Sequence, residues 1–427
     1  MEYKEEQLKK GIKLHMIKTN KFKTNLIAVF LTSKLERKDV TKNALISKIL
    51  RRGSKTMPTQ EEISKQMEGM YGAGFDSGLD KTGDNQVLKF YIETVNDKYL
   101  PKSNKNILNE SIDKILEIVF NPYIDDESFR TEYIEQEKIN LKQRIEGRKD
   151  NKAKYSLERC IEEMYPDEPF GLYSFGYIED LNKIDGKNLY QYYKEFINNC
   201  KIDIFVSGDI EGIEEQVLEN ENIKKLKERD PNYIIPEICK KRIIEKENVV
   251  IESMDVTQGK LVLGLDVNIE DSELKYDALM YNNILGGSAN SKMFQNVREK
   301  AHLAYVASSS YLRYKNNIFV NCGIEISNYE KALELIKKQI EDMKNGDFSE
   351  EDITNSKKGI IATINTIDDE QDTCVTYYFG QELSQNKISV DEYIKRIEKI
   401  NKEDILNIAK KVNINTIYFL TNTEEKK

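Results

Sequence analysis

The chain has 427 residues, and its 65 Lys and Arg residues against 74 Asp and Glu residues give a formal net charge of −9 at pH 7. This length favours two or more domains, and the acidic balance argues against a protein that mainly coats nucleic acid. No apolar run approaches the roughly 18 residues that a membrane-spanning helix needs. The N-terminal residues MEYKEEQLKKG also lack the apolar core of a secretion signal. These features predict a cytoplasmic protein that binds neither nucleic acid nor membranes.

Histidine occurs only twice in the sequence, as His15 and His302, which lie far apart. Zinc motifs of the H-E-x-x-H and H-x-x-E-H types require two histidines about one helical turn apart, so that both reach one ion. The chain therefore cannot form either motif. Its five cysteines include no C-x-x-C pair, which indicates reduced thiols rather than a disulfide framework or a thiolate zinc site.

The two halves of the chain contain similar segments in the same order. The segment Ala44–Leu50 is followed shortly by Gly53 and Ser54, and the similar segment Ala278–Leu285 is followed by Gly286–Ser288. Further along, Asn121–Glu127 precedes a long charged segment, as Asn345–Glu351 does. Two echoes in one order indicate a duplicated domain.

Each half is predicted to contain a strand, a helix, further strands and two helices. In the first half, Val87–Ile92 alternates as a strand does, and Ile107–Phe120 carries an apolar stripe at helical spacing. In the second half, Ile318–Ile324 and Tyr329–Met343 show the same two patterns. Strands in runs with long helices favour α+β domains in which helices cover one face of a sheet.

The charged stretch from Glu221 to Lys246 contains Pro231 and Pro236, so it is predicted to be a linker. We therefore expect an N-terminal α+β domain over residues 1–220, a linker over 221–246 and a C-terminal α+β domain over 247–427. Two similar halves joined in this way would form a clamp.

The most specific motif lies in the second half. Asn283–Ser288 contains two glycines, and Phe294–Tyr305 contains R-E-K followed by H-L-A-Y. This segment resembles the second-domain signature of the insulinase/pitrilysin family of zinc peptidases, which includes the mitochondrial processing peptidase; His302 stands where glycine is usual. Pro169–Gly171 and Val206–Ile210 resemble two further family motifs, although Glu168 replaces a histidine beside the first.

The resemblance covers the whole chain and implies a metallopeptidase-like duplicated fold. In that fold, two homologous domains each have a mainly antiparallel sheet covered by helices, and together they form half of a clamp. The glycines of Gly286–Ser288 lack the G-K-[ST] ending of a phosphate loop, so we expect them to form a tight turn that caps a helix.

The resemblance also implies that this chain has lost the family's metal site. Active members carry H-x-x-E-H, and the three working positions of that motif correspond here to Ala44, Ser47 and Lys48. The family's remaining zinc ligand, seven residues after a glutamate that matches Glu137, corresponds to Arg144. Two cations would repel zinc, so we expect no metal or other cofactor on this chain. Alternatively, Lys48 and Arg144 are ordinary solvated helix residues.

Two groups of residues remain as candidates for binding peptide. Arg298 and Tyr305 correspond to the family's arginine and tyrosine that contact bound peptide, and both residue types suit peptide carbonyls. Alternatively, they form a buried hydrogen-bonded pair that ties a helix to a strand. Gly74, Phe75 and Asp76 correspond to a first-domain edge strand that accepts peptide by strand addition, although the glycines and Asp76 weaken strand propensity.

The leading functional hypothesis is a non-catalytic subunit that pairs with a zinc-bearing paralogue and helps it to bind peptide substrate. In that case the chain is not a peptidase by itself but part of a heterodimeric metalloendopeptidase, and zinc is expected only on the partner. The alternatives are a structural scaffold, a peptide-binding homodimer without proteolysis and an active peptidase with a different site.

Overall fold

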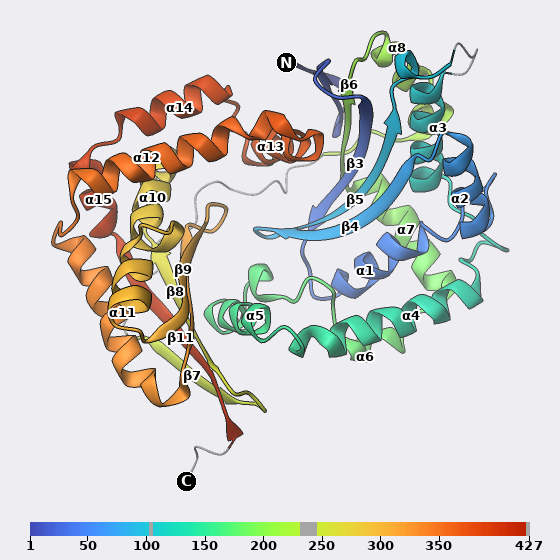
Figure 1. Ribbon diagram of the computed structural model, residues 1–427. Coiled ribbons are helices and arrows are strands. Elements are labelled where there is room, and N and C mark those ends of the chain that lie inside the picture. The colour runs from blue at the N-terminus through green and yellow to red at the C-terminus, as the bar shows by residue number, and fades with distance from the viewer. Residues whose placement is uncertain (102–105, 231–245, 424–427) are drawn as a thin grey trace. The chain divides into compact units, whose positions relative to one another are not determined.

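The computed structural model describes residues 1–101, 106–230 and 246–423. Contacts divide these residues into two compact units, each of which combines one sheet with helices (Figure 1). The first unit consists of residues 1–146, 172–230 and 368–383, and the second of residues 147–171, 246–367 and 384–423. The predicted α+β fold class is confirmed.

Each unit includes a segment from the other half of the sequence. Residues 368–383 belong to the first unit and residues 147–171 to the second. The predicted division into 1–220, 221–246 and 247–427 did not include this exchange. Most of the predicted linker, residues 231–245, lies outside the described residues.

The first unit contains six strands and most of the helices of the first half. Its strands are β1 (Glu2–Lys9), β2 (Ile12–Lys18), β3 (Thr24–Lys34), β4 (Gly74–Thr82), β5 (Asn85–Val95) and β6 (Lys201–Gly208). Its helices are α1 (Val40–Ile49), α2 (Gln60–Gly69), α3 (Ile107–Phe120), α4 (Thr131–Glu146), α6 (Ile178–Leu181), α7 (Gly186–Asn199), α8 (Ile213–Glu219), α9 (Glu221–Lys225) and, from the second half, α13 (Gln371–Ser384).

The second unit contains five strands. These are β7 (Asn248–Ser253), β8 (Gly259–Val267), β9 (Ala304–Leu312), β10 (Asn317–Ile324) and β11 (Val412–Thr421). Its α-helices are α5 (Lys152–Met164), α10 (Lys275–Asn282), α11 (Tyr329–Lys344), α12 (Glu350–Asn365), α14 (Val390–Lys399) and α15 (Lys402–Ala409), and the segments η5 (Asn283–Gly287) and η6 (Met293–Lys300) are π-helical.

The two sheets repeat one topology. The first has the order β1-β2-β6-β3-β5-β4 and the second the order β7-β11-β8-β10-β9. The β2–β6 and β7–β11 pairs are parallel, and all other pairs in both sheets are antiparallel. The second sheet therefore matches the first without β1, which supports the duplication that the sequence echoes indicated. It also makes β4 and β9 equivalent edge strands.

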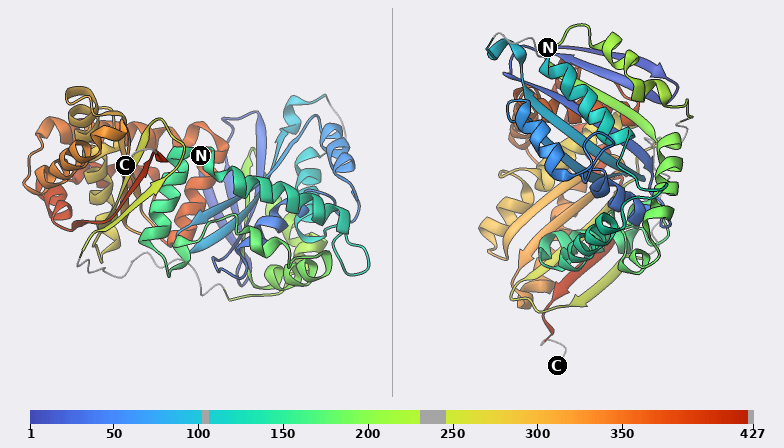
Figure 2. Two further views of the ribbon diagram at one scale, coloured as in Figure 1. Left: turned by 90° about the horizontal axis from the view of Figure 1, so that it is seen from below. Right: turned by 90° about the vertical axis from the view of Figure 1, so that its right-hand side faces the viewer.

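The central strands β3, β6 and β8 are buried on both faces, so each face of both sheets needs its own cover. In the second sheet, Leu261, Leu263 and Leu265 of β8 pack in a core with the helices of the second half. The alternate residue Val262 packs on the opposite face, with Cys160 and Met164 of α5. Figures 1 and 2 show α5 on the side of this sheet that the other helices leave uncovered.

Helix α13 covers the corresponding face of the first sheet. Phe379 of α13 packs edge-on against Phe30 of β3, with ring centroids 4.4 Å apart. Close by, the carboxylate of Glu382 accepts hydrogen bonds of 2.9 Å from Nζ of Lys13 on β2, and it pairs at 2.9 Å with Lys201 on β6. Lys201 and Glu382 are both buried. A buried network of opposite charges therefore fixes α13 to the sheet.

Two further observations concern the cysteines and the possibility of a membrane-spanning helix. Cys160, Cys200, Cys322 and Cys374 are buried and form no disulfide, and Cys239 lies outside the described residues. None of the helices in the described ranges combines the length and the apolar composition that crossing a bilayer requires.

We predict that Glu382→Gln destabilises the protein by about 2 kcal/mol, because it removes one of the two carboxylates that neutralise the buried ammonium group of Lys201. Urea denaturation would measure the loss. Glu195→Gln is the control, since Glu195 is exposed on α7, and it should change stability by less than about 0.5 kcal/mol. Equal effects of the two substitutions would show that the network does not anchor α13.

Candidate functional site

The positions that resemble H-x-x-E-H lie on α1, and none of them offers a metal ligand. Ala44 and Ser47 are buried, and the Ser47 hydroxyl donates a hydrogen bond of 2.8 Å to the carbonyl oxygen of Ala44. Lys48 lies in the last turn of the helix and is half-buried. A methyl group cannot coordinate zinc, and a protonated lysine has no free lone pair.

The carboxylate that matches the family's helical glutamate is already neutralised. Glu137 is buried on α4, which packs against α1. Nε of Arg52 donates a hydrogen bond of 2.6 Å to Oε1 of Glu137, and Nη2 of the same arginine bonds to that oxygen as well. Glu137 is therefore an ion-pair partner here rather than an available ligand.

Lys48 and Arg144 place two positive charges where the resemblance would place a metal and its ligands. Burial lowers the pKa of Lys48, and the charges of Arg51 and Arg144 lower it further. The guanidinium of Arg144 lies 3.8 Å from the centre of the Phe175 ring. Neither Lys48 nor Arg144 forms an ion pair with a carboxylate of the described residues. Zinc does not fit this set of residues, because the ligands are missing and the charge is repulsive.

The edge strand β4 runs beside these cations. Ser77 Oγ donates a hydrogen bond of 3.0 Å to the carbonyl oxygen of Ser47, which joins β4 to α1 immediately before Lys48. Arg51 pairs with the exposed Asp76 at 3.0 Å. Gly74, Phe75 and Asp76 thus lie at the edge of the first sheet, as the resemblance implied, and a strand forms there despite the two glycines.

Arg298 and Tyr305 lie in the second unit, and both are exposed. Arg298 is on η6, with its guanidinium 4.6 Å from the centre of the Phe294 ring. Tyr305 is 61% exposed on the edge strand β9. Residue 305 is the extra residue of a β-bulge, so that Tyr305 and Val306 are both exposed instead of alternating between faces. The alternative of a buried pair that ties a helix to a strand is therefore wrong.

The structure explains why glycine is favoured at two positions of the second-half motif, one of which is His302 in this chain. His302 has a φ of 54°, in the left-handed region, which explains why glycine is usual at this place in the family. The expected helix-capping turn at Gly286 is wrong, because Gly286 lies within the π-helical η5 and has no positive φ. A Cβ on Gly286 would lie 2.6 Å from the backbone nitrogen of Ser309, so close packing against β9 is what requires glycine.

Comparisons with known proteins agree with the fold and with the replaced metal ligands. Residues 183–360 match the family model described as "Peptidase M16 inactive domain". The chain is 35% identical over 415 residues to the "Probable inactive metalloprotease YmfF" of Bacillus subtilis (strain 168), with 97% of this chain and 96% of that one covered. The chain belongs to the peptidase M16 family. This is the insulinase/pitrilysin family that the sequence resembles, so the expected membership is confirmed.

Two further relatives extend the comparison of this M16 chain. The crystal structure of a conserved protein from Enterococcus faecalis V583 matches with a TM-score of 0.90 at 29% identity and 100% coverage of both chains. The "Uncharacterized zinc protease YmxG" of Bacillus subtilis (strain 168) is 23% identical over 286 residues, which cover 62% of this chain and 68% of that one. The chain is a homologue of inactive M16 metalloproteases.

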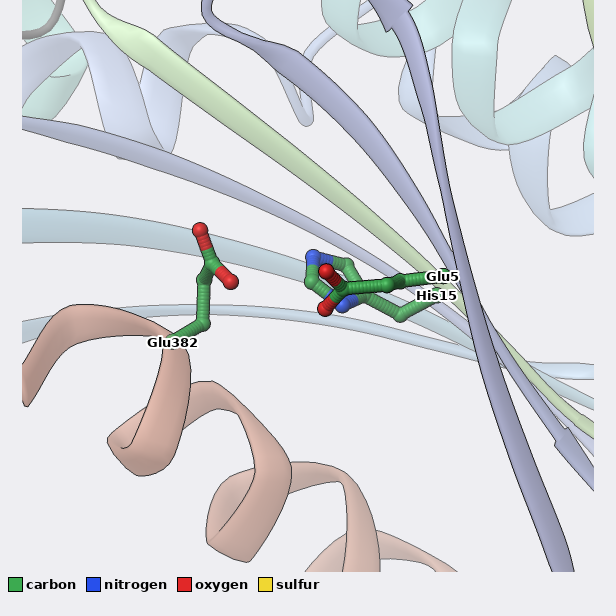
Figure 3. Close-up of side chains that lie close together, drawn as sticks. All are labelled: Glu5, His15 and Glu382. Carbon is green, nitrogen blue, oxygen red and sulfur yellow. The ribbon is translucent and has the colours of Figure 1, made fainter. Parts of the chain in front are cut away.

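One cluster of titratable residues in this M16 chain gave no signal in the sequence. Glu5 of β1, His15 of β2 and Glu382 of α13 point toward one another in Figure 3, and their possible ligand atoms lie within 4.8 Å of each other. However, Lys13 and Lys201 already hold the Glu382 carboxylate. The cluster is a network of ion pairs rather than a metal site, because a dication would have to displace two ammonium groups.

Asp203 of β6 completes the same network on the first sheet. Its Oδ1 lies 2.9 Å from Nε2 of His15, whose Nδ1 lies 2.7 Å from the hydroxyl of Tyr3. Both oxygens of Asp203 accept hydrogen bonds of 2.8 Å from Nζ of Lys201. Burial opposes ionisation of Asp203, but Lys201 and His15 outweigh it and lower its pKa from 3.8 to about 2.

We predict that Asp203 makes the stability of the first unit depend on acid pH. Since its folded pKa lies below its unfolded pKa, its contribution is present above about pH 4 and is lost as the pH falls through about 2. Asp203→Asn should therefore be less stable than the wild type at pH 6, and the gap should narrow by about 2 kcal/mol by pH 2. Urea denaturation at each pH measures the gap, and a constant gap would contradict the assignment.

We also predict that three substitutions restore zinc binding. Ala44→His, Lys48→His and Arg144→Glu together place two imidazoles and a carboxylate at the positions that resemble the family's ligands. The triple variant should bind about one zinc ion per chain, whereas the wild type should bind none at the same concentration, as judged by isothermal calorimetry and metal analysis. A folded triple variant without zinc would show that these positions do not converge.

Proposed function

We propose that this chain is a non-catalytic M16 subunit that pairs with a zinc-bearing paralogue to form a heterodimeric peptidase. In this proposal the chain contributes binding of the peptide substrate, and the partner contributes the metal and the hydrolytic step. The observation that carries the proposal is a contrast within one chain. The metal positions are replaced, whereas Arg298 and Tyr305 keep their residue types and are exposed.

Because both side chains are exposed, packing inside the second unit does not account for their residue types, whereas contact with a bound peptide would. Arg298 can donate through a planar guanidinium to peptide carbonyls, and the Tyr305 hydroxyl is a single directed donor. Within residues 1–101, 106–230 and 246–423, the one hydrogen bond of the Tyr305 hydroxyl is a long contact of 3.5 Å with Glu325. The Bacillus subtilis relatives are named a "Probable inactive metalloprotease" and an "Uncharacterized zinc protease", so relatives with both kinds of name come from one organism.

The proposal predicts that the chain raises the activity of its partner without being active itself. The purified chain should not cleave a quenched fluorescent peptide, and it should increase the turnover of a paralogue from the same organism that has an intact H-x-x-E-H motif. Arg298→Ala should reduce this increase about tenfold or more, because a charge-assisted hydrogen bond to substrate is lost. Light scattering would report whether the two chains form a complex.

Lys300→Ala is the matched control, since Lys300 is an exposed cation on the same π-helical segment. It should leave the increase in turnover almost unchanged. If Arg298→Ala lowers only the unfolding temperature, the residue is structural and the chain is better described as a scaffold. Cleavage by the wild-type chain alone, with stoichiometric zinc, would refute the proposal.

A further inference from the structure

Lys48 of α1 and Arg144 of α4 stand at the replaced metal positions, on two helices that pack against each other. The chain's net charge is −9, and neighbouring arginines have acidic partners: Arg51 pairs with Asp76, and Arg52 pairs with Glu137. Lys48 and Arg144 have no such partner among the residues that the structure describes. Burial and the charges of Arg51 and Arg144 lower the pKa of Lys48 more than the carboxylates of Asp76 and Glu137 raise it, so a further anion at this place would favour the charged ammonium.

The place of these cations indicates what kind of anion could reach them. Lys48 follows Ser47, whose carbonyl oxygen accepts the hydrogen bond from Ser77 of β4. β4 pairs on one side with β5 and is the last strand of its sheet. A Cβ built on Gly74 or Gly78 meets no atom within 4 Å, so the space beside both glycines is open. An extended peptide that pairs with β4 would therefore pass close to Lys48.

We propose that Lys48 and Arg144 bind the carboxylate of an Asp or Glu side chain within an extended peptide that pairs with β4. The inference rests on the proposed peptide-binding function and adds a charge preference to it. Phe175 holds the Arg144 guanidinium by stacking against it, which leaves its edge N–H groups available to a carboxylate. Lys48 supplies a second donor from α1.

A side chain inside the peptide fits this place better than a C-terminal carboxylate does. Ser77, which marks the position of the cations along the strand, lies within β4 rather than at either of its ends, Gly74 and Thr82. A peptide that pairs with the whole strand would continue past the cations in both directions. Its terminus would then lie beyond them, and an internal acidic residue would lie beside them.

Binding of defined peptide pools tests the charge preference. Each pool consists of nonapeptides with a central Glu, Gln or Lys, with Val, Thr and Ser in equal mixture elsewhere, and with both ends capped. Fluorescence anisotropy of the labelled pools on the full chain should give about tenfold tighter binding for Glu than for Gln. Lys should bind most weakly. A pool with central Gln and a free C-terminus shows whether a terminal carboxylate serves equally well.

Matched variants connect the preference to the two residues. Lys48→Met combined with Arg144→Met should remove the preference for Glu over Gln while leaving the affinity for the Gln pool within about twofold, because main-chain pairing with β4 remains. Lys142→Met is the control, since Lys142 is an exposed cation on the same helix as Arg144, and it should keep the full preference. Thermal unfolding checks that all variants are folded.

The outcomes separate this inference from the proposed function. If the Glu and Gln pools bind equally well, or if the double variant keeps the preference, the inference is wrong and peptide binding stands. If the free C-terminus binds as tightly as the internal Glu, the assignment to an internal side chain is wrong. If no pool binds the wild-type chain, both the peptide-binding function and this inference are overturned.

Discussion

The pairing of Glu382 with Lys13 and Lys201 is the interaction on which the first unit depends most. A sheet that is buried on both faces needs two helical covers, and the helices of the first half cover only one face of the first sheet. Helix α13 supplies the other cover, but it reaches the sheet from far along the sequence. Aromatic packing such as that of Phe379 on Phe30 gives this contact its apolar area. The buried charges restrict where the helix can sit, because any shift would separate the Glu382 carboxylate from Lys13 and Lys201.

The second unit also needs a second helical cover for its sheet, but apolar contacts rather than buried charges hold that cover in place. Helix α5 covers its sheet mainly with apolar residues, among them Cys160 and Met164. Polar contacts lie at the margin, where Glu252 of β7 accepts hydrogen bonds of 2.7 Å from Tyr155 and 2.8 Å from Tyr418. The duplication therefore conserves the topology of the sheet and the need for a second cover. It does not conserve the side chains that hold the cover in place.

The sequence predicted the helices and strands that a local pattern of apolar residues determines. Helix α3 has the predicted bounds, and the strand and helix predicted at Ile318–Ile324 and Tyr329–Met343 differ from β10 and α11 by one residue each. The exchange of α5 and α13 could not be predicted, because an amphipathic pattern shows that a face is buried but not which sheet covers it. The cluster of His15 and Glu382 was missed for the same reason, since 367 residues separate the two partners.

For the candidate site, the motif identified the residue types, and the structure showed their exposure and their ion-pair partners. The sequence identified Lys48 and Arg144 as replacements for ligands, but only coordinates show that neither has an acidic partner in the described part of the chain, while Arg51 and Arg52 have one each. Likewise, the motif could not distinguish an exposed Tyr305 from a buried one. The bulge in β9 that exposes it depends on pairing with β10, which leaves no mark in a single sequence.

The replaced metal site keeps one property of a zinc centre and loses the other. A zinc ion supplies positive charge that attracts acidic and carbonyl oxygens, and it also activates water for attack. Lys48 and Arg144 retain the charge as fixed ammonium and guanidinium groups. Neither accepts a proton from water near neutral pH in this charged state. The Ser47 hydroxyl cannot substitute as a base, because it lacks the charge of a carboxylate and donates a hydrogen bond to the carbonyl oxygen of Ala44. These residues can attract an oxygen atom but cannot activate water, which agrees with the chain's homology to inactive M16 metalloproteases.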